Sequence, residues 1–254
     1  MQEEENKNHT VRLKAIILAG GKGTRGRPYT EYFPKAMTPI KDKPLIDYIV
    51  RYLNSFDFIK EIIIISDYEG LGGQIKNYYS NPKNGKKITF VQDTQSGTGG
   101  DLLHIEDKLE GDSEFVLWFV DNLCAIDLVK MRNVFKEKNS TACIATRTKR
   151  KEETGFAVVE NEIIKEFKEK PTMKLQLSEC LGIYILGKEV IKRIKAKTKQ
   201  KEINLSFDIL QQLSKEGKIS AYDIEDKEWI DAESPVVLER NERTVKKIIK
   251  QMGF

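Results

Sequence analysis

Histidine and cysteine are scarce in this chain of 254 residues. The two histidines are His9 and His104, and the three cysteines are Cys124, Cys143 and Cys180. None of them stands in a Cys-x-x-Cys or Cys/His cluster, which argues against a structural zinc site. An odd number of cysteines without a secretory signal favours a reducing compartment, so we expect a cytoplasmic protein.

Long apolar runs and an excess of one charge are also missing. No run reaches the length of about 18 apolar residues that a membrane span requires. The 43 Lys and Arg residues nearly balance 39 Asp and Glu residues, for a net charge of +4. Such a balance is typical of a solvated surface and not of the basic face of a nucleic-acid binder. We therefore expect neither membrane nor nucleic acid as a partner.

Short apolar runs alternate with amphipathic segments up to about residue 150. Residues 61–66 and 114–120 are continuous apolar runs of the buried-strand kind, and residues 44–56 have a helical apolar face. This alternation predicts an α/β fold with a doubly wound, mostly parallel, Rossmann-like sheet. Further strands are expected at 13–19, 87–92 and 141–148, and further helices at 71–79, 99–109 and 126–138.

The pattern changes after residue 150. Residues 156–159 and 163–168 predict a β-hairpin, followed by strands at 179–186 and 219–224 and helices at 188–195, 205–215 and 234–251. The charged stretch 147–153 predicts a solvated loop between the two halves, about 13–150 and 151–254. We expect residues 1–12 to form a flexible tail and residues 13–254 a single domain.

A glycine-rich loop with several cations follows the first apolar run, in the sequence AIILAGGKGTRGRPYTEYFPK at residues 15–35. Gly20, Gly21 and Gly23 let backbone N–H groups approach a polyphosphate closely. Arg25 and Lys35 add fixed positive charge. The loop therefore predicts a site for a phosphorylated nucleotide.

Two other phosphate motifs fit this loop less well. Gly21-x-Gly23-x-x-Gly26 matches a dinucleotide fingerprint, but that motif must open a helix, and Pro28 and Pro34 disfavour one. No Gly-Lys-Ser/Thr sequence closes a P-loop. The segment instead resembles the G-G-x-G-T-R-x-x-P-x-T…P-K signature of the sugar-nucleotide pyrophosphorylases, departing from it only at Gly26, where that family usually has an apolar residue.

This resemblance implies an enzyme that joins a sugar 1-phosphate to a nucleoside triphosphate and releases pyrophosphate. It implies a nucleotide-binding half at about 13–150 and a smaller, hairpin-containing sugar-binding half at about 151–254, without the β-helix of longer members. Gln92 and Gly97 match the base-recognition element, and the Gln92 amide suits uracil or thymine. UTP or dTTP with glucose 1-phosphate are thus the favoured substrates. The implied nucleotide-binding residues are Leu18, Ala19, Gly20, Gly21, Gly23, Thr24, Gln92, Gly97 and Thr98.

The resemblance also implies a catalytic set and a metal. Arg25, Lys35 and Asp121 are the implied catalytic residues, and Asp121 and Asp231 the implied ligands of a Mg²⁺ cofactor. Asp121 matches a G-D-N motif in which Val120 replaces the glycine. Asp231 matches a W-x-D motif whose usual G-T continuation is missing. The phosphate nucleophile is already an anion, so the reaction needs no general base, which agrees with the scarcity of histidine.

The sugar phosphate is expected at Gly155, Glu169 and Lys170, since Glu169-Lys170-Pro171 resembles the family's E-K-P motif. The sugar-contacting Asn expected shortly before Gly182 is not evident, which leaves the sugar open. Open alternatives are GTP with mannose 1-phosphate, another acceptor such as phosphocholine, and a regulatory homologue that binds sugar nucleotides without turnover. A homo-oligomer is a further open alternative.

Overall fold

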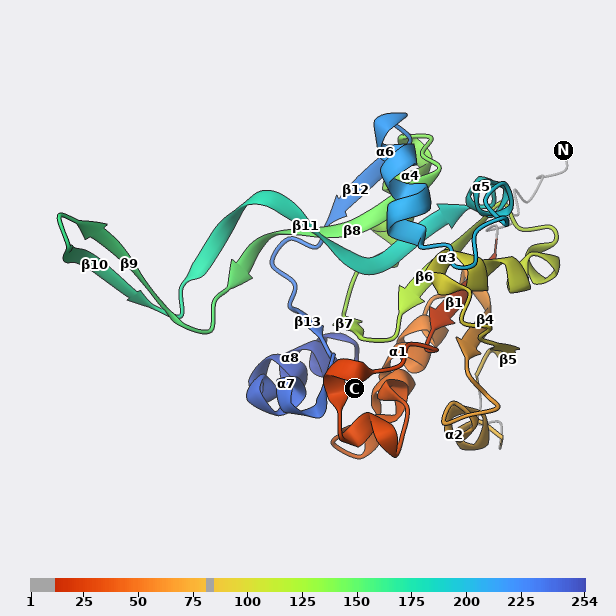
Figure 1. Cartoon of the computed structure of the whole chain (residues 1–254), viewed down its shortest axis with the longest axis horizontal. Coiled ribbons are helices and arrows are strands. Elements are labelled where there is room, and N and C mark those ends of the chain that lie inside the picture. The colour runs from red at the N-terminus through yellow and green to blue at the C-terminus, as the bar shows by residue number, and fades with distance from the viewer. Residues whose placement is uncertain (1–11, 81–84) are drawn as a thin grey trace, which may run out of the picture.

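The apolar runs form a seven-stranded sheet in the computed structural model, which describes residues 12–80 and 85–254. Its strands are β1 (Leu13–Leu18), β4 (Ile59–Ser66), β5 (Lys87–Gln92), β6 (Glu114–Phe119), β8 (Ala142–Lys151), β11 (Thr172–Gly187) and β12 (Ile219–Asp223). They lie in the order β12-β8-β11-β6-β1-β4-β5 (Figure 1). Only β11 runs antiparallel to its neighbours, β6 and β8. The predicted mostly parallel sheet is confirmed.

The helices are α1 (Leu45–Asn54), α2 (Gly73–Tyr78), α3 (Gly97–Gly100), α4 (Leu128–Glu137), α5 (Glu189–Lys195), α6 (Gln211–Lys215), α7 (Pro235–Arg240) and α8 (Glu242–Gln251). Short 3₁₀ turns are η1 (Thr24–Gly26), η2 (Tyr29–Glu31), η3 (Lys35–Met37), η4 (Asp101–Ile105) and η5 (Asp107–Leu109), and η6 (Leu205–Leu210) is a π-helix. Within the described ranges, none of these helices is long and apolar enough to cross a membrane.

Both faces of the sheet are buried, because alternate side chains of each strand enter different cores. Ile17 of β1 lies in a core with residues of α1, α4 and α8. Its neighbour Ile16 lies in a second core with residues of η4, α5 and η6. Continuous apolar strands such as β4 follow from this burial on two sides.

Three of the predicted helices differ in detail. Residues 99–109 are not one helix, because α3 ends after one turn and the chain continues as η4 and η5. The N–H groups of Gly99 and Gly100 donate to the carbonyl of Ile203 instead. Residues 205–215 begin as the π-helix η6. Residues 234–251 form α7 and α8, which are separated by Asn241.

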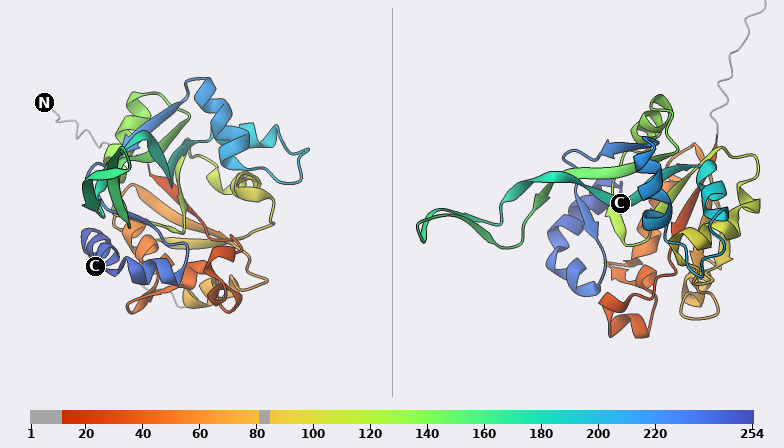
Figure 2. Two further views of the ribbon diagram at one scale, coloured as in Figure 1. Left: turned by 60° about the vertical axis from the view of Figure 1, so that its left-hand side comes forward. Right: turned by 45° about the horizontal axis from the view of Figure 1, so that its top comes forward.

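An arm projects from the body of the molecule. The predicted hairpin is confirmed as β9 (Gly155–Glu160) and β10 (Ile163–Glu169), which pair only with each other. The outer parts of β8 and β11 carry it away from the sheet (Figures 1 and 2). The prediction of a loop at 147–153 is wrong for most of the stretch, because residues 147–151 belong to β8. We call residues 149–178 the arm.

Four shorter strands complete the fold: β2 (Pro39–Ile40), β3 (Lys43–Pro44), β7 (Asn122–Cys124) and β13 (Trp229–Asp231). β13 pairs antiparallel with β7 and places Asp231 opposite Asn122. A C-terminal segment thereby reaches the edge where β1, β5 and β6 end. The predicted tail, residues 1–12, lies outside the described residues except for Arg12.

Candidate functional site

A cavity of about 400 Å³ opens at the carboxyl ends of β1, β5 and β6. This is the edge at which open α/β sheets bind ligands. Most of the predicted nucleotide and catalytic residues line it: Leu18, Ala19, Gly20, Gly21, Gly23, Thr24, Arg25, Lys35, Gly97, Thr98 and Asp121. The structure thus brings together residues from three separate segments of the chain. Their roles stay predictions.

The glycine loop wraps around one threonine. Gly23 has a φ of 60°, and a Cβ there would lie 2.8 Å from Thr30 Cγ2. The Thr30 hydroxyl donates to the Gly23 carbonyl at 2.7 Å. A Cβ on Gly26 would also lie 2.7 Å from Thr30 Cγ2, although Gly26 has an ordinary φ. Any residue larger than glycine at position 26 would clash with the Thr30 side chain. This clash is a local steric reason for Gly26 to replace the apolar residue of the family signature.

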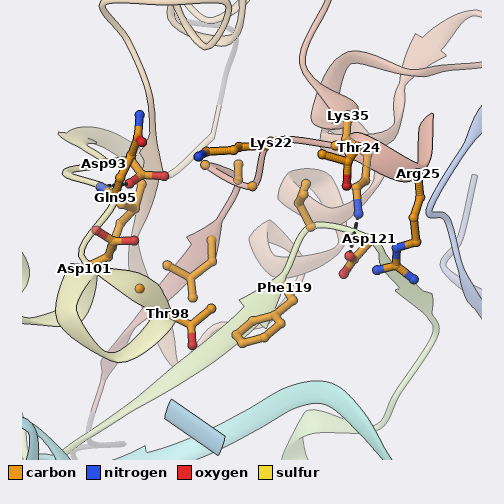
Figure 3. A pocket seen from close by; sticks show the side chains of 18 of the residues that line it. Lys22, Thr24, Arg25, Lys35, Asp93, Gln95, Thr98, Asp101, Phe119 and Asp121 are labelled. Atoms are coloured by element: carbon orange, nitrogen blue, oxygen red, sulfur yellow. Dashed lines mark hydrogen bonds and ion pairs between the residues drawn. The ribbon is translucent and has the colours of Figure 1, made fainter. Parts of the chain in front are cut away.

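Charged groups from three segments meet at one end of the cavity (Figure 3). The Lys35 ammonium donates to Asp121 Oδ2 at 2.7 Å, and the two side chains are only 12% and 21% exposed. Arg25 donates to Glu233, and its Nη1 lies 3.7 Å from Asp231 Oδ2. An anionic ligand that enters here therefore meets two cations that are already held in place.

Asp231 lies beside Asp121 without lining the cavity itself. The N–H of Ala232 donates to the Asp121 carbonyl at 2.6 Å, which ties the two segments together. Asp231 Oδ1 is buried and has no hydrogen-bond partner. Burial, with the nearby Asp121 charge, raises the pKa of Asp231 to about 6.

The Asp121 and Asp231 carboxylates fit a hard divalent cation. Such a cation would relieve the repulsion between the two negative charges and would bind Asp231 Oδ1, the oxygen that has no hydrogen-bond partner. In the described part of the chain, no three His, Cys, Asp or Glu side chains gather as a metal site. Two protein carboxylates would therefore need phosphate oxygens and water to complete a coordination shell. Magnesium commonly binds in this way.

Gln92 does not line the cavity. Its amide oxygen accepts from the N–H of Tyr68 at 2.9 Å. Its amide nitrogen donates to Asp67 Oδ1 at 3.0 Å and to the Asp93 carbonyl at 3.1 Å. These bonds occupy the amide oxygen and amide nitrogen of Gln92, the two groups that were expected to bind the base. The structure therefore does not bring the Gln92 side chain to the cavity with the other predicted nucleotide-binding residues.

Two carboxylates that sequence reasoning missed stand at the opposite end of the cavity from Arg25 (Figure 3). Asp93 lies over the backbone of Gly20, where an added Cβ would come within 1.5 Å of Asp93 Oδ2. Asp101 Oδ1 accepts from the Thr94 backbone and from nearby hydroxyls. Burial and the Asp93 charge raise the pKa of Asp101. Lys22, Gln95 and Glu202 also line the cavity without having been predicted.

The predicted sugar-phosphate residues lie together, but on the arm. A Cβ on Gly155 would lie 3.1 Å from Glu169 Oε2. The N–H of Lys170 donates to the Thr154 carbonyl at 3.2 Å, and Lys170 has a φ of 47°. None of the three lines the cavity, and the arm leads away from it (Figure 1). The structure therefore does not bring them to the other predicted residues of the same chain.

Comparison with known proteins places these features in a family. The nucleotidyl transferase family matches residues 14–237. A UTP–glucose-1-phosphate uridylyltransferase of Synechocystis is 31% identical over 238 residues, covering 86% of this chain and 60% of the relative. The bifunctional protein GlmU of Methanocaldococcus jannaschii is 32% identical over 241 residues, covering 93% of this chain and 55% of the relative.

A third relative and a solved structure extend the comparison. A mannose-1-phosphate guanyltransferase of Yarrowia lipolytica is 29% identical over 231 residues, covering 88% of this chain and 61% of the relative. The chain thus spans 55–61% of the length of these relatives. A Bacillus anthracis structure assigned as a glucose-1-phosphate thymidylyltransferase has 26% identity and a TM-score of 0.70, covering 95% of this chain and 99% of that one. The chain belongs to the nucleotidyl transferase family.

Proposed function

We propose that the protein transfers a nucleotidyl group from a nucleoside triphosphate to a sugar 1-phosphate, giving a nucleoside diphosphate sugar and pyrophosphate. The observation that carries this proposal is the meeting of the glycine loop, Arg25, Lys35 and Asp121 in one cavity. The names of the relatives, which include uridylyl and guanyl transferases of sugar phosphates, support it.

The reaction requires two polyanions to come together. An oxygen of the sugar phosphate attacks the α-phosphorus in line, a P–O bond forms, and pyrophosphate leaves with the electrons of the bridging bond. Positioning and charge neutralisation supply the catalysis, since the nucleophile carries no proton to remove. Arg25 would hold the α-phosphate and the leaving group with its planar fork, and Lys35 would contact the α-phosphate.

Asp121 and Asp231 would hold Mg²⁺, which when bound supplies charge neutralisation to the phosphates. The buried, unpartnered oxygen of Asp231 supports this assignment. Lys35, which now pairs with Asp121, would exchange that partner for phosphate oxygens when the site fills. The Asp121 carboxylate would then be free to bind the metal.

The nucleotide has two candidates. The sequence-based preference, UTP or dTTP with glucose 1-phosphate, agrees with the uridylyl relatives but depended on Gln92. The second candidate is GTP, with mannose 1-phosphate as the acceptor, and the buried carboxylates Asp93 and Asp101 favour its guanine base. A carboxylate can accept from both the N1–H and the 2-amino group of guanine, whereas uracil offers it one donor, N3–H, flanked by two carbonyl oxygens that repel it.

The test is a pyrophosphate-release assay with the purified protein over a matrix of triphosphates and sugar 1-phosphates, with Mg²⁺ or with a chelator. We expect turnover that requires both substrates and the metal. Tight binding of a sugar nucleotide without turnover of any pair would contradict the proposal and favour the regulatory alternative.

Asp93→Asn, assayed in the same matrix, separates the two nucleotide candidates. If a carboxylate reads guanine, the variant loses rate with GTP by at least about tenfold and much less with UTP. An equal loss of rate with all triphosphates would indicate that Asp93 supports the glycine loop at Gly20 and does not recognise the base.

A further inference from the structure

Two carboxylates from the C-terminal part of the chain hold the Arg25 guanidinium. Arg25 Nη1 donates to Glu233 Oε2 and lies 3.7 Å from Asp231 Oδ2. The Arg25 side chain is 63% exposed, whereas the Glu233 side chain is only 30% exposed. Glu233 is therefore the more enclosed member of the pair, and Arg25 is the member with room to move.

The backbone on both sides of Glu233 is fixed. Ala232 is fully buried, and its N–H donates to the Asp121 carbonyl at 2.6 Å. On the other side, the Ser234 hydroxyl accepts from the N–H of Val237 and caps the start of α7. These contacts keep the Glu233 carboxylate at the end of the cavity where Arg25 and Asp121 meet.

The glycine loop leaves room for the segment that carries Glu233. A Cβ built on Gly26 would lie 3.4 Å from the Glu233 carbonyl oxygen and 2.7 Å from Thr30 Cγ2. Position 26 and the stretch after Asp231 both depart from the pyrophosphorylase motifs, and the structure places the two side by side. The pairing of Arg25 with Glu233 is thus built from residues in which this chain differs from those motifs.

The charge of Arg25 cannot serve its carboxylates and a phosphate equally well. A guanidinium has several N–H donors but a single charge. Mg²⁺ would neutralise Asp231 together with Asp121. Glu233 has no such second cation, because in the described part of the chain Arg25 is the only cationic side chain within ion-pair distance of it. Glu233 therefore opposes any phosphate that approaches the guanidinium.

We propose that Glu233 is an internal competitor for Arg25, which holds the guanidinium before a nucleotide binds and yields it to the phosphates. This inference rests on the proposed function, in which Arg25 binds the α-phosphate and the leaving group. Glu233 touches no reacting atom and acts through Arg25 alone. It lowers the affinity for the triphosphate, and for the pyrophosphate product, by about two- to fivefold, the size expected of an exposed ion pair.

Nitrogen-15 NMR of the Arg25 guanidinium tests the pairing in protein without nucleotide. A guanidinium that is held by a carboxylate rotates slowly and gives resolved Nη signals at low temperature, and Arg25→Lys assigns these signals by removing them. We expect Glu233→Gln to merge them. The matched control is Glu31→Gln, because Glu31 lies 3.8 Å from Arg27 on the same loop, outside the cavity. Arg25 signals that Glu233→Gln leaves unchanged would overturn the inference.

Calorimetry with non-hydrolysable GTP and UTP in Mg²⁺ tests the competition. Glu233→Gln should bind the nucleotide about two- to fivefold more tightly than the wild type, and Glu31→Gln should bind it as the wild type does. In turnover assays Glu233→Gln should lower KM for the triphosphate without raising kcat. Weaker binding, or a lower kcat with unchanged binding, would show that Glu233 positions Arg25 for the reaction, and would overturn the inference.

Arg25→Ala separates competition for the guanidinium from general charge repulsion. In the Arg25→Ala background, Glu233→Gln should improve binding by less than about twofold, because the group for which Glu233 competes is gone. A gain as large as in the wild-type background would overturn the inference. Failure of the wild type to bind either nucleotide would instead contradict the proposed function, and the NMR comparison would still decide whether Glu233 holds Arg25.

Discussion

Asp231→Asn is expected to stabilise the metal-free protein while it abolishes the response to Mg²⁺. The Asp231 carboxylate is partly buried beside Asp121, and its pKa is raised from 3.8 to about 6. The folded state therefore holds this proton more tightly than the unfolded state does. Stability is lost as the pH rises through the window from about 4 to 6 and stays lost at pH 8.

The size of the effect follows from the shift. About two pKa units correspond to ~3 kcal/mol. The Asp231 side chain is 36% exposed, so solvent screening reduces this to about 1 kcal/mol. For a domain of this size, ~1 kcal/mol raises the melting temperature by about 2–4 °C.

Thermal denaturation measures the difference. In chelator at pH 8, Asp231→Asn should melt above the wild type, and near pH 4 the difference should vanish. Adding Mg²⁺ should raise the melting temperature of the wild type only. Asp226→Asn, at a side chain that is 91% exposed, should change nothing. A variant that melts below the wild type at pH 8 would refute the explanation that burial and the neighbouring Asp121 charge make the ionised Asp231 carboxylate unfavourable.

Three further changes test the site and the fold. Arg25→Ala should lower pyrophosphate release by about two orders of magnitude, whereas Arg27→Ala, which lies outside the cavity, should change it little. Gly97→Ala should cost about 2–4 kcal/mol in urea denaturation, because Gly97 has a φ of 85° and its Cβ would lie 2.6 Å from a backbone carbonyl. Gly217→Ala, at a φ of 67° with nothing nearby, should cost only about 1 kcal/mol. Asp112→Ala should cost about 3–5 kcal/mol in the same assay, because it leaves two lysine ammonium groups without their buried carboxylate.

The sheet and the phosphate end of the site could be predicted because their signals are local. The apolar runs of β1, β4 and β6 are buried on both faces, which leaves a continuous pattern in the sequence. The glycine loop and Asp121 directly follow two of these strands, so the end of each strand fixes their place.

The base end could not be predicted in the same way. The orientation of Gln92 depends on Tyr68 and Asp67, which follow a different strand and are about 24 positions away in the chain. A motif gives the positions of its residues along the chain but not the hydrogen-bond partners that compete for their side chains. The sequence signal for the base end was Asp93, a carboxylate that directly follows strand β5 next to Gln92.

The arm was misjudged for a related reason. Residues 147–151 of β8 pair with β11 outside the core, so no alternation between buried and exposed side chains marks them as a strand. Their charges then resemble those of a loop. The apolar residues of β9 and β10 predicted the hairpin correctly, but nothing local indicates that it stands away from the cavity.

A crystal structure with a non-hydrolysable triphosphate and Mg²⁺ tests the central claim most directly. We expect a triphosphate along residues 20–24, with Arg25 and Lys35 on its oxygens and the metal between Asp121 and Asp231. A nucleotide bound elsewhere, or a metal that leaves both aspartates untouched, would contradict it.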